Sequence, residues 1–153
     1  MAQVWRTNDV LVVIDMQHAF ADADSPWRAP RFDEALINVE RLRLSFPGQV
    51  VLTRFVWDPA EPGAWHDYYD QWPAMRRAAD EAAWQLIPAV GESDIVMSAP
   101  TFSKWGADMA AAVPQDARMI LCGVATDCCV IATAMAAVDA GRQVILVADA
   151  CAG

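Results

Sequence analysis

The chain has 153 residues, of which 56% are hydrophobic, and a formal net charge of −9. This length predicts one domain over residues 1–153, with enough apolar residues for a buried core. The negative charge argues against nucleic acid and anionic membranes as partners. No long apolar run predicts a membrane span, and the N-terminal residues lack a signal-peptide pattern, so we expect a cytoplasmic protein. The four cysteines lack the spacing of a disulfide framework and fit a reducing compartment.

Short apolar runs alternate with segments of helical periodicity along the whole chain. We expect strands over residues 10–14, 49–57, 94–97, 119–122 and 143–148. We expect helices over residues 32–46, 75–87 and 107–113, and in the Ala-rich segment that ends at residue 140. Segment 64–72 joins aromatic and acidic residues, and it is either a short helix or lid over a site, or a segment that covers an interface or surface. The alternation predicts an α/β fold, with helices on both faces of a parallel sheet.

The stretch over residues 119–140 carries the most informative local pattern. Its apolar start predicts a strand, the next four residues a tight turn, and the remainder a helix. Cys128 and Cys129 fall in the first helical turn, where the helix dipole and free backbone N–H groups lower the pKa of a thiol and can hold an oxyanion. This placement indicates a cysteine nucleophile. The alternative is that both cysteines are small buried apolar residues.

Three chemically useful side chains are expected at one edge of the sheet. Asp15 follows the first strand, Lys104 lies in a loop after the third, and Cys129 follows the fourth. Such a trio suits acyl transfer: the carboxylate accepts the thiol proton, the ammonium stabilises negative charge, and the thiolate attacks a carbonyl. Asp15 has a second interpretation as a loop cap. Arg54, late in the second strand, either binds a substrate carboxylate or, as we favour, is a surface or ion-paired arginine.

Three segments resemble one known family. They are VVIDMQHAF, GVATDCCVIATAMAAVDAG and VILVADACAG, which begin at residues 12, 123 and 144. Together they resemble the isochorismatase-like cysteine hydrolase superfamily, which includes nicotinamidases, N-carbamoylsarcosine amidohydrolases and isochorismatases. The resemblance implies a Rossmann-like three-layer α/β fold with a central parallel sheet of usually six strands. Five strands are visible here, and the chain ends where the sixth is expected, so a missing segment or another subunit would cover that edge.

The resemblance also assigns roles to residues of this chain. It implies that Cys129 is the nucleophile, that Cys128 fills a variable position, and that Asp15 is the family's catalytic aspartate, which follows the first strand. It further implies a non-proline cis peptide bond between Val124 and Ala125. The backbone N–H groups of Ala125 and Cys129 would then form the oxyanion hole.

Two departures from the family pattern affect the expected chemistry. Many relatives carry a lysine before a P-T-Y-S stretch, but here Ala99 takes that position and Lys104 follows five residues later. Either Lys104 reaches back as a replacement, which we favour, or the catalytic lysine is lost. Nicotinamidases bind a metal through an Asp and several His after the second strand, whereas this chain offers Asp58 and a distant His66. We therefore expect no metal and no other cofactor.

The leading interpretation is a cysteine hydrolase that cleaves a small amide or carbamoyl C–N bond through a thioester on Cys129. The residues expected to wall its substrate pocket are Phe20, Trp57, Trp65, Tyr68, Phe102, Trp105 and Thr126. Two alternatives stay open: an isochorismatase-type vinyl ether hydrolase that uses Asp15 as an acid, and a catalytically silent homologue that serves in binding or assembly. The expected partners are a small-molecule substrate and further copies of the chain, as a dimer or tetramer.

Overall fold

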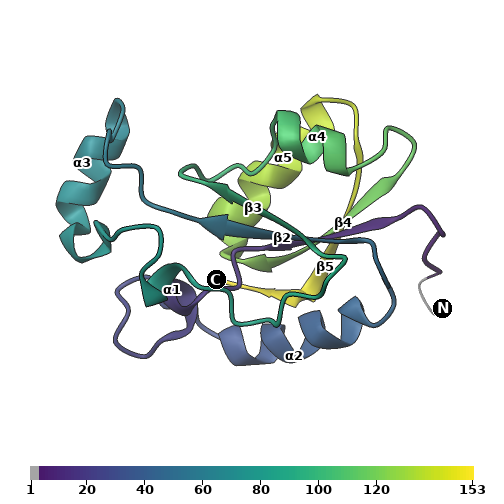
Figure 1. The fold of residues 1–153 in the computed structure, drawn as a ribbon, viewed down its shortest axis with the longest axis horizontal. Coiled ribbons are helices and arrows are strands. Elements are labelled where there is room, and N and C mark those ends of the chain that lie inside the picture. Colours follow the sequence, from purple (N-terminus) through teal and green to yellow (C-terminus); the bar gives the residue numbers. More distant parts are fainter. Residues whose placement is uncertain (1–3) are drawn as a thin grey trace.

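The computed structural model describes residues 4–153. Its centre is a parallel sheet of five strands in the order β3-β2-β1-β4-β5 (Figure 1). The strands are β1 (Val10–Ile14), β2 (Val50–Phe55), β3 (Ile95–Ala99), β4 (Arg118–Val124) and β5 (Gln143–Ala152). All four strand pairings are parallel, so the expected α/β fold with a parallel central sheet is confirmed.

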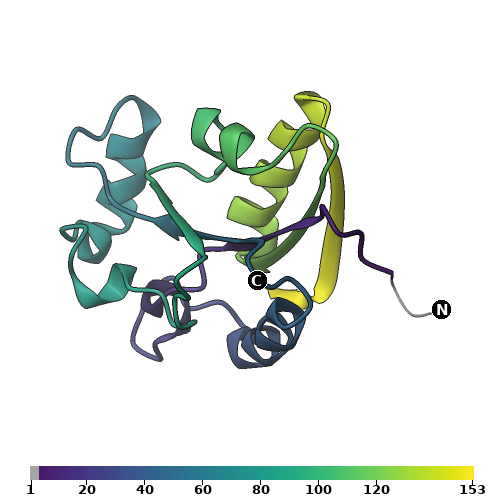
Figure 2. The ribbon, with the colours of Figure 1, turned by 45° about the vertical axis from the view of Figure 1, so that its right-hand side comes forward.

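Helices lie on both sides of this sheet. They are α1 (His18–Ala21), α2 (Phe32–Arg43), α3 (Ala64–Gln71), α4 (Ala107–Ala112) and α5 (Ile131–Asp139), with short turns η1 (Pro73–Met75), η2 (Ala82–Trp84) and η3 (Thr126–Val130). Figures 1 and 2 show α2 on one face of the sheet and α4 with α5 on the other, which gives three layers. No helix of the described chain combines the length and the apolar character that a membrane crossing requires.

The two inner strands form the core of the molecule. Every residue of β1 is buried, and so is every residue of β4 except Arg118, as expected for apolar strands covered on both faces. Their register pairs Val12 with Leu121 and Ile14 with Gly123. Because all strands run in the same direction, the residues that follow β1, β2, β3 and β4 meet at one edge of the sheet.

Gly123 lets the ends of β1 and β4 approach each other closely. Its φ is +113°, and a Cβ built there would lie 2.1 Å from the carbonyl oxygen of Ile14. Only glycine fits this contact without moving the backbone. The glycine thus fixes where the chain leaves the sheet and enters the turn that carries Cys129.

Residues 75–87, expected to be one helix, form no α-helix. Between η1 and η2 their backbone is irregular, and two of the carbonyl groups in this segment are bound by the side chains of Arg54 on β2 and Gln17 after β1. Arg54 donates to the carbonyl oxygens of Trp84 (2.9 Å) and Ala79 (2.7 Å), and Gln17 Nε2 also donates to that of Trp84 (2.8 Å). These bonds replace the helical ones, and they show that Arg54 holds a neighbouring segment of backbone.

Candidate active site

Asp15, Lys104 and Cys129 lie together at the carboxyl edge of the sheet. Asp15 directly follows β1, Lys104 lies in the loop between β3 and α4, and Cys129 lies in the π-helical turn η3 that follows β4. Their exposed fractions are 0%, 7% and 2%, so bulk water is largely excluded from all three. Lys104 Nζ lies 3.1 Å from Asp15 Oδ2, which makes this a buried ion pair. Charges in such surroundings act on one another more strongly than they would in water.

Asp15 is held by its backbone and by one of its carboxylate oxygens. Its φ of 49° lies in the left-handed region, which is uncommon for a residue other than glycine and recurs at functional sites. Thr53 Oγ1 on β2 donates to Oδ1 (2.7 Å) and accepts from the Asp15 N–H (3.2 Å). The second oxygen, Oδ2, faces Lys104 as an ion pair but makes no hydrogen bond to any described residue. Oδ2 is therefore the acceptor that can receive a proton.

The side chain of Lys104 extends from the loop after β3 to Asp15, as the sequence led us to favour. Ala99 ends β3, and the loop after it carries Lys104 above the sheet edge. Its ammonium group donates to the carbonyl oxygen of Thr101 and lies 4.5 Å from the ring centroid of Phe55. An aromatic face stabilises a cation through its quadrupole. The amine is thus held beside Asp15 although the preceding strand ends in alanine.

The thiol of Cys129 is protonated in this site. Burial, followed by the charge of Asp15, raises the pKa of Cys129 well above the ordinary thiol value, while Lys104 acts in the opposite direction. The sequence led us to expect a lowered pKa from the helix dipole, and that expectation is wrong for the free protein. Desolvation penalises the thiolate more than the first turn of a helix stabilises it. A nucleophilic role for this thiol would therefore require that its proton be removed during the attack.

The backbone before η3 offers a further hydrogen-bond donor. The peptide bond between Val124 and Ala125 is cis, at the position that the family resemblance implies. The Ala125 carbonyl accepts hydrogen bonds from the N–H groups of Cys128 (3.2 Å) and Val130 (3.1 Å). Its own N–H donates to no acceptor within residues 4–153. A free N–H beside the thiol is the kind of group that binds an oxyanion.

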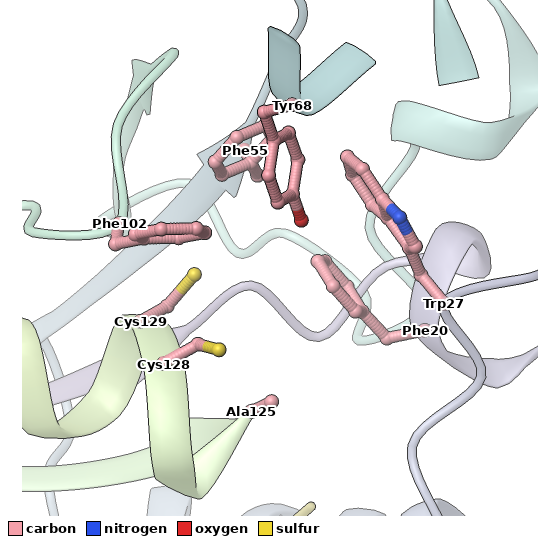
Figure 3. A pocket seen from close by; sticks show the side chains of 8 residues that line it. All are labelled: Phe20, Trp27, Phe55, Tyr68, Phe102, Ala125, Cys128 and Cys129. Atoms are coloured by element: carbon pink, nitrogen blue, oxygen red, sulfur yellow. The ribbon is translucent and has the colours of Figure 1, made fainter. Parts of the chain in front are cut away.

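A cavity of about 150 Å³ opens over the thiol. Figure 3 shows aromatic rings on its upper and right-hand sides, with the sulfur atoms of Cys128 and Cys129 and the methyl group of Ala125 opposite. The Tyr68 hydroxyl points into this space (Figure 3). The lining residues are Phe20, Trp27, Phe55, Tyr68, Phe102, Ala125, Cys128 and Cys129. No charged side chain is among them, so the cavity suits a small and largely apolar group.

Four of the residues expected to wall the pocket do not line this cavity. Trp57 turns away to donate from Nε1 to Glu61 (2.8 Å), and Trp65 packs behind Phe102 with ring centroids 4.9 Å apart. Trp105 stacks under Arg142, and Thr126 begins η3 without lining the cavity. These tryptophans are near enough in sequence to suggest a wall, but their rings have other partners.

Two residues at the site carry no clear signal in the sequence. Trp27 comes from the irregular segment between α1 and α2, and its ring lies 5.6 Å from that of Phe55 and 5.9 Å from that of Tyr68. Gln17 is fully buried and bonds both backbone groups of Phe55, to the oxygen at 2.9 Å and from the nitrogen at 2.7 Å. A glutamine three residues after the end of a buried strand is the one hint available beforehand.

The family model described as "Isochorismatase domain" matches residues 9–153. The chain belongs to the isochorismatase family. This match confirms the resemblance found in its sequence segments, and it makes the chain an enzyme of a hydrolase family. No curated protein sequence matches the chain.

Solved structures of isochorismatase-like proteins share its fold. A cysteine hydrolase from Pseudomonas syringae pv. phaseolicola 1448A superposes with a TM-score of 0.83 at 20% identity, over 100% of this chain and 79% of the other. An N-carbamoylsarcosine amidase from Thermoplasma acidophilum gives 0.76 at 22% identity, over 95% and 84%. A pyrazinamidase from Pyrococcus horikoshii, in complex with zinc, gives 0.78 at 24% identity, over 95% and 87%.

In this isochorismatase-family member, the two side chains that the sequence offers as metal ligands, Asp58 and His66, have other partners. His66 is engaged with Glu61 (3.1 Å) and Asp70 (3.7 Å), and Asp58 accepts the N–H of Ala60 (2.9 Å). Within residues 4–153, no three His, Cys, Asp or Glu side chains converge in a metal-binding arrangement. No step of the chemistry below is therefore routed through a metal.

Proposed function

We propose that the chain hydrolyses the C–N bond of a small amide or carbamoyl compound through a thioester on Cys129. The observation that carries this proposal is the pairing of a protonated, buried thiol with a carboxylate whose Oδ2 lacks a hydrogen bond and faces a lysine. A nucleophile beside its base, with the base oriented by a further group, is the arrangement that covalent catalysis requires.

In the first half of the reaction, Asp15 Oδ2 takes the proton from Cys129 Sγ as the sulfur attacks the carbonyl carbon. The new C–S bond places negative charge on the carbonyl oxygen, which the N–H groups of Ala125 and Cys129 would bind. Collapse of this tetrahedral species breaks the C–N bond, and the leaving amine takes the proton held by Asp15. One well-placed oxyanion donor contributes about 10²- to 10³-fold to the rate.

In the second half, water attacks the thioester and Asp15 accepts the proton of that water. The acid product leaves, and the proton returns to Cys129 Sγ, so that the free enzyme is restored. Lys104 Nζ stays beside Asp15 Oδ2, and its charge offsets part of the negative charge that builds on sulfur.

The cavity limits which substrates fit. At about 150 Å³ it is smaller than the pockets that enclose drug-sized ligands, and its walls are aromatic rings and two thiols. A short aliphatic or single-ring amide without charge fits these walls. A charged acyl group would lose its hydration without gaining a partner.

Ammonia release from a panel of small neutral amides and carbamoyl compounds tests the proposal. We expect release by the native chain, loss of release in Cys129→Ala, and retention in Cys128→Ala, a matched variant that changes the neighbouring thiol. Hydroxylamine should intercept the thioester and yield a hydroxamate. Release that survives in Cys129→Ala would contradict the proposal, and so would a native chain that releases ammonia from none of the compounds.

A further inference from the structure

The loop that carries Lys104 is shaped mainly by contacts within itself. Lys104 is the only lysine in the sequence, and it lies in irregular backbone over residues 100–106. Thr101 Oγ1 donates to the Ser103 carbonyl (2.8 Å), a bond between near neighbours in the chain. A bond of this kind shapes the loop but does not fix its distance from the turn that holds Cys129.

One hydroxyl group joins the two halves of the site. Thr133 lies on α5, with an exposed fraction of 0%. Its Oγ1 accepts a hydrogen bond from the Lys104 N–H (2.9 Å) and donates one to the carbonyl oxygen of Cys129 (2.7 Å). A hydroxyl can do both at once, because it has one hydrogen and two lone pairs. The same oxygen thus contacts the backbone of the lysine and that of the nucleophile.

We propose that Thr133 is a positioning residue whose hydroxyl sets the separation between Lys104 and Cys129, and thereby the reactivity of the thiol. The inference rests on the proposed function only in assuming that these two side chains act together. The hydrogen bond to Thr133 matters more for Lys104 than it would for a lysine on a strand. A loop residue needs such a contact to hold its side chain in a buried ion pair.

The surroundings of Cys129 give the direction of the expected effect. The titratable groups that face it are Asp15 after β1, Lys104 after β3, Tyr68 on α3 and Cys128 on its own turn. Lys104 lowers the pKa of Cys129, whereas Asp15 and Cys128 raise it. If the hydroxyl is removed, the Lys104 N–H loses its partner and the loop can shift. The ammonium then acts less on the sulfur, and the pKa of Cys129 rises.

Alkylation of Cys129 by iodoacetamide, followed by peptide mass spectrometry, measures this effect without a substrate. Below the pKa the rate follows the thiolate fraction, so a rise of one pKa unit slows alkylation about tenfold at fixed pH. We expect Thr133→Val, which keeps the shape and removes the hydroxyl, to react about three- to tenfold more slowly with a shifted pH profile. Thr133→Ser keeps the hydroxyl and should react like the native chain.

Two further measurements separate positioning from a merely structural role. Because the chain has one lysine, ¹³C-lysine labelling gives a single side-chain Cε signal, which should move in Thr133→Val and stay in place in Thr133→Ser. In a Lys104→Met background, Thr133→Val should cause no further slowing of alkylation, since the group it positions is gone.

Three results would overturn the inference: equal alkylation of Thr133→Val and the native chain, equal slowing in Thr133→Ser, or full slowing that persists without Lys104. If circular dichroism shows that Thr133→Val does not fold, Thr133→Ala takes its place with the same expectations. A chain that releases no ammonia would contradict the proposed function and leave these alkylation results fully readable.

Discussion

Asp15 has two effects on Cys129 that oppose each other. Its charge raises the pKa of the thiol, which keeps the nucleophile protonated at rest. Its unbonded Oδ2 is also the group placed to remove that proton during attack. The residue therefore lowers the amount of free thiolate and, under the proposed function, also removes the proton during attack. A protonated resting thiol has the advantage of reacting slowly with oxidants and other electrophiles.

Asp15→Asn should separate these two effects. Without the carboxylate, the pKa of Cys129 falls, so alkylation by iodoacetamide at fixed pH becomes faster. Amide turnover should nevertheless fall by at least about 10²-fold, since the base is gone. The matched control is Asp127→Asn, because Asp127 raises the pKa of Cys128 and not that of Cys129. Slower alkylation of Cys129 in Asp15→Asn would contradict this account.

Lys104→Met removes one partner of a buried ion pair. The unpaired carboxylate of Asp15 should lower the free energy of unfolding by about 3 kcal/mol near neutral pH, as measured by urea unfolding. The double variant Asp15→Asn/Lys104→Met should recover much of that loss, because no unpaired charge is left buried. If Lys104→Met alone were as stable as the native chain, this would show that water reaches the Asp15–Lys104 ion pair. Turnover should be lost in both variants.

At the scale of elements, Gly123 determines how β4 ends. Gly123→Ala would place a methyl group 2.1 Å from the Ile14 carbonyl oxygen and force an unfavourable positive φ. We expect a loss of at least about 2 kcal/mol in the free energy of unfolding, read from tryptophan fluorescence in urea. Gly141→Ala is the control, because φ is also positive there but no atom lies within 4 Å of the added Cβ. The loss in the free energy of unfolding should then be about 1 kcal/mol. Equal losses would show that strain in φ, and not the collision, dominates.

The sequence predicts some elements well because their pattern of apolar residues matches the burial of those residues in the fold. Residues 10–14 are apolar throughout, and an unbroken apolar run is the pattern expected for a strand that is buried on both faces. Residues 75–87 have apolar spacing that suits a helix, yet Arg54 and Gln17 bind their carbonyl groups and hold them in irregular backbone. Those two partners stand more than twenty residues earlier in the chain, so local periodicity contains no information about them.

At the scale of the molecule, the candidate site is predictable where it depends on the sheet. Asp15 and Cys129 follow neighbouring parallel strands, and that topology alone brings them to one edge. The pocket walls depend on loops, whose paths the sequence does not fix. Trp27 reaches the cavity from the segment between α1 and α2, whereas Trp57 and Trp105 point elsewhere, although Trp105 directly follows Lys104 in the sequence.

Two carboxylates that do not line the cavity make the fold sensitive to acid. Asp9 is fully buried, and Arg118 Nε donates to its Oδ1 (2.8 Å), which lowers the pKa of Asp9. Glu61 is bound by Arg76 through Nε (2.6 Å) and Nη2 (2.9 Å), which lowers its pKa from 4.5 to about 2. The Asp9–Arg118 pair adds a side-chain contact beside the β1–β4 ladder, and the Glu61–Arg76 pair joins two irregular segments.

A lowered folded-state pKa means that the unfolded chain binds protons first as the pH falls. The stability that these two groups contribute is therefore complete above the unfolded values of 3.8 and 4.5. The contribution of Asp9 is lost as the pH falls below 3.8, and that of Glu61 as the pH falls toward about 2. The urea concentration at the unfolding midpoint, measured between pH 6 and pH 2, should decrease as the pH drops through this range. Glu61→Gln should be less stable at pH 6, and its midpoint should fall less on acidification. A native chain whose midpoint rises below pH 4 would contradict this, since it would show that relief of its net charge of −9 outweighs the loss of both ion pairs.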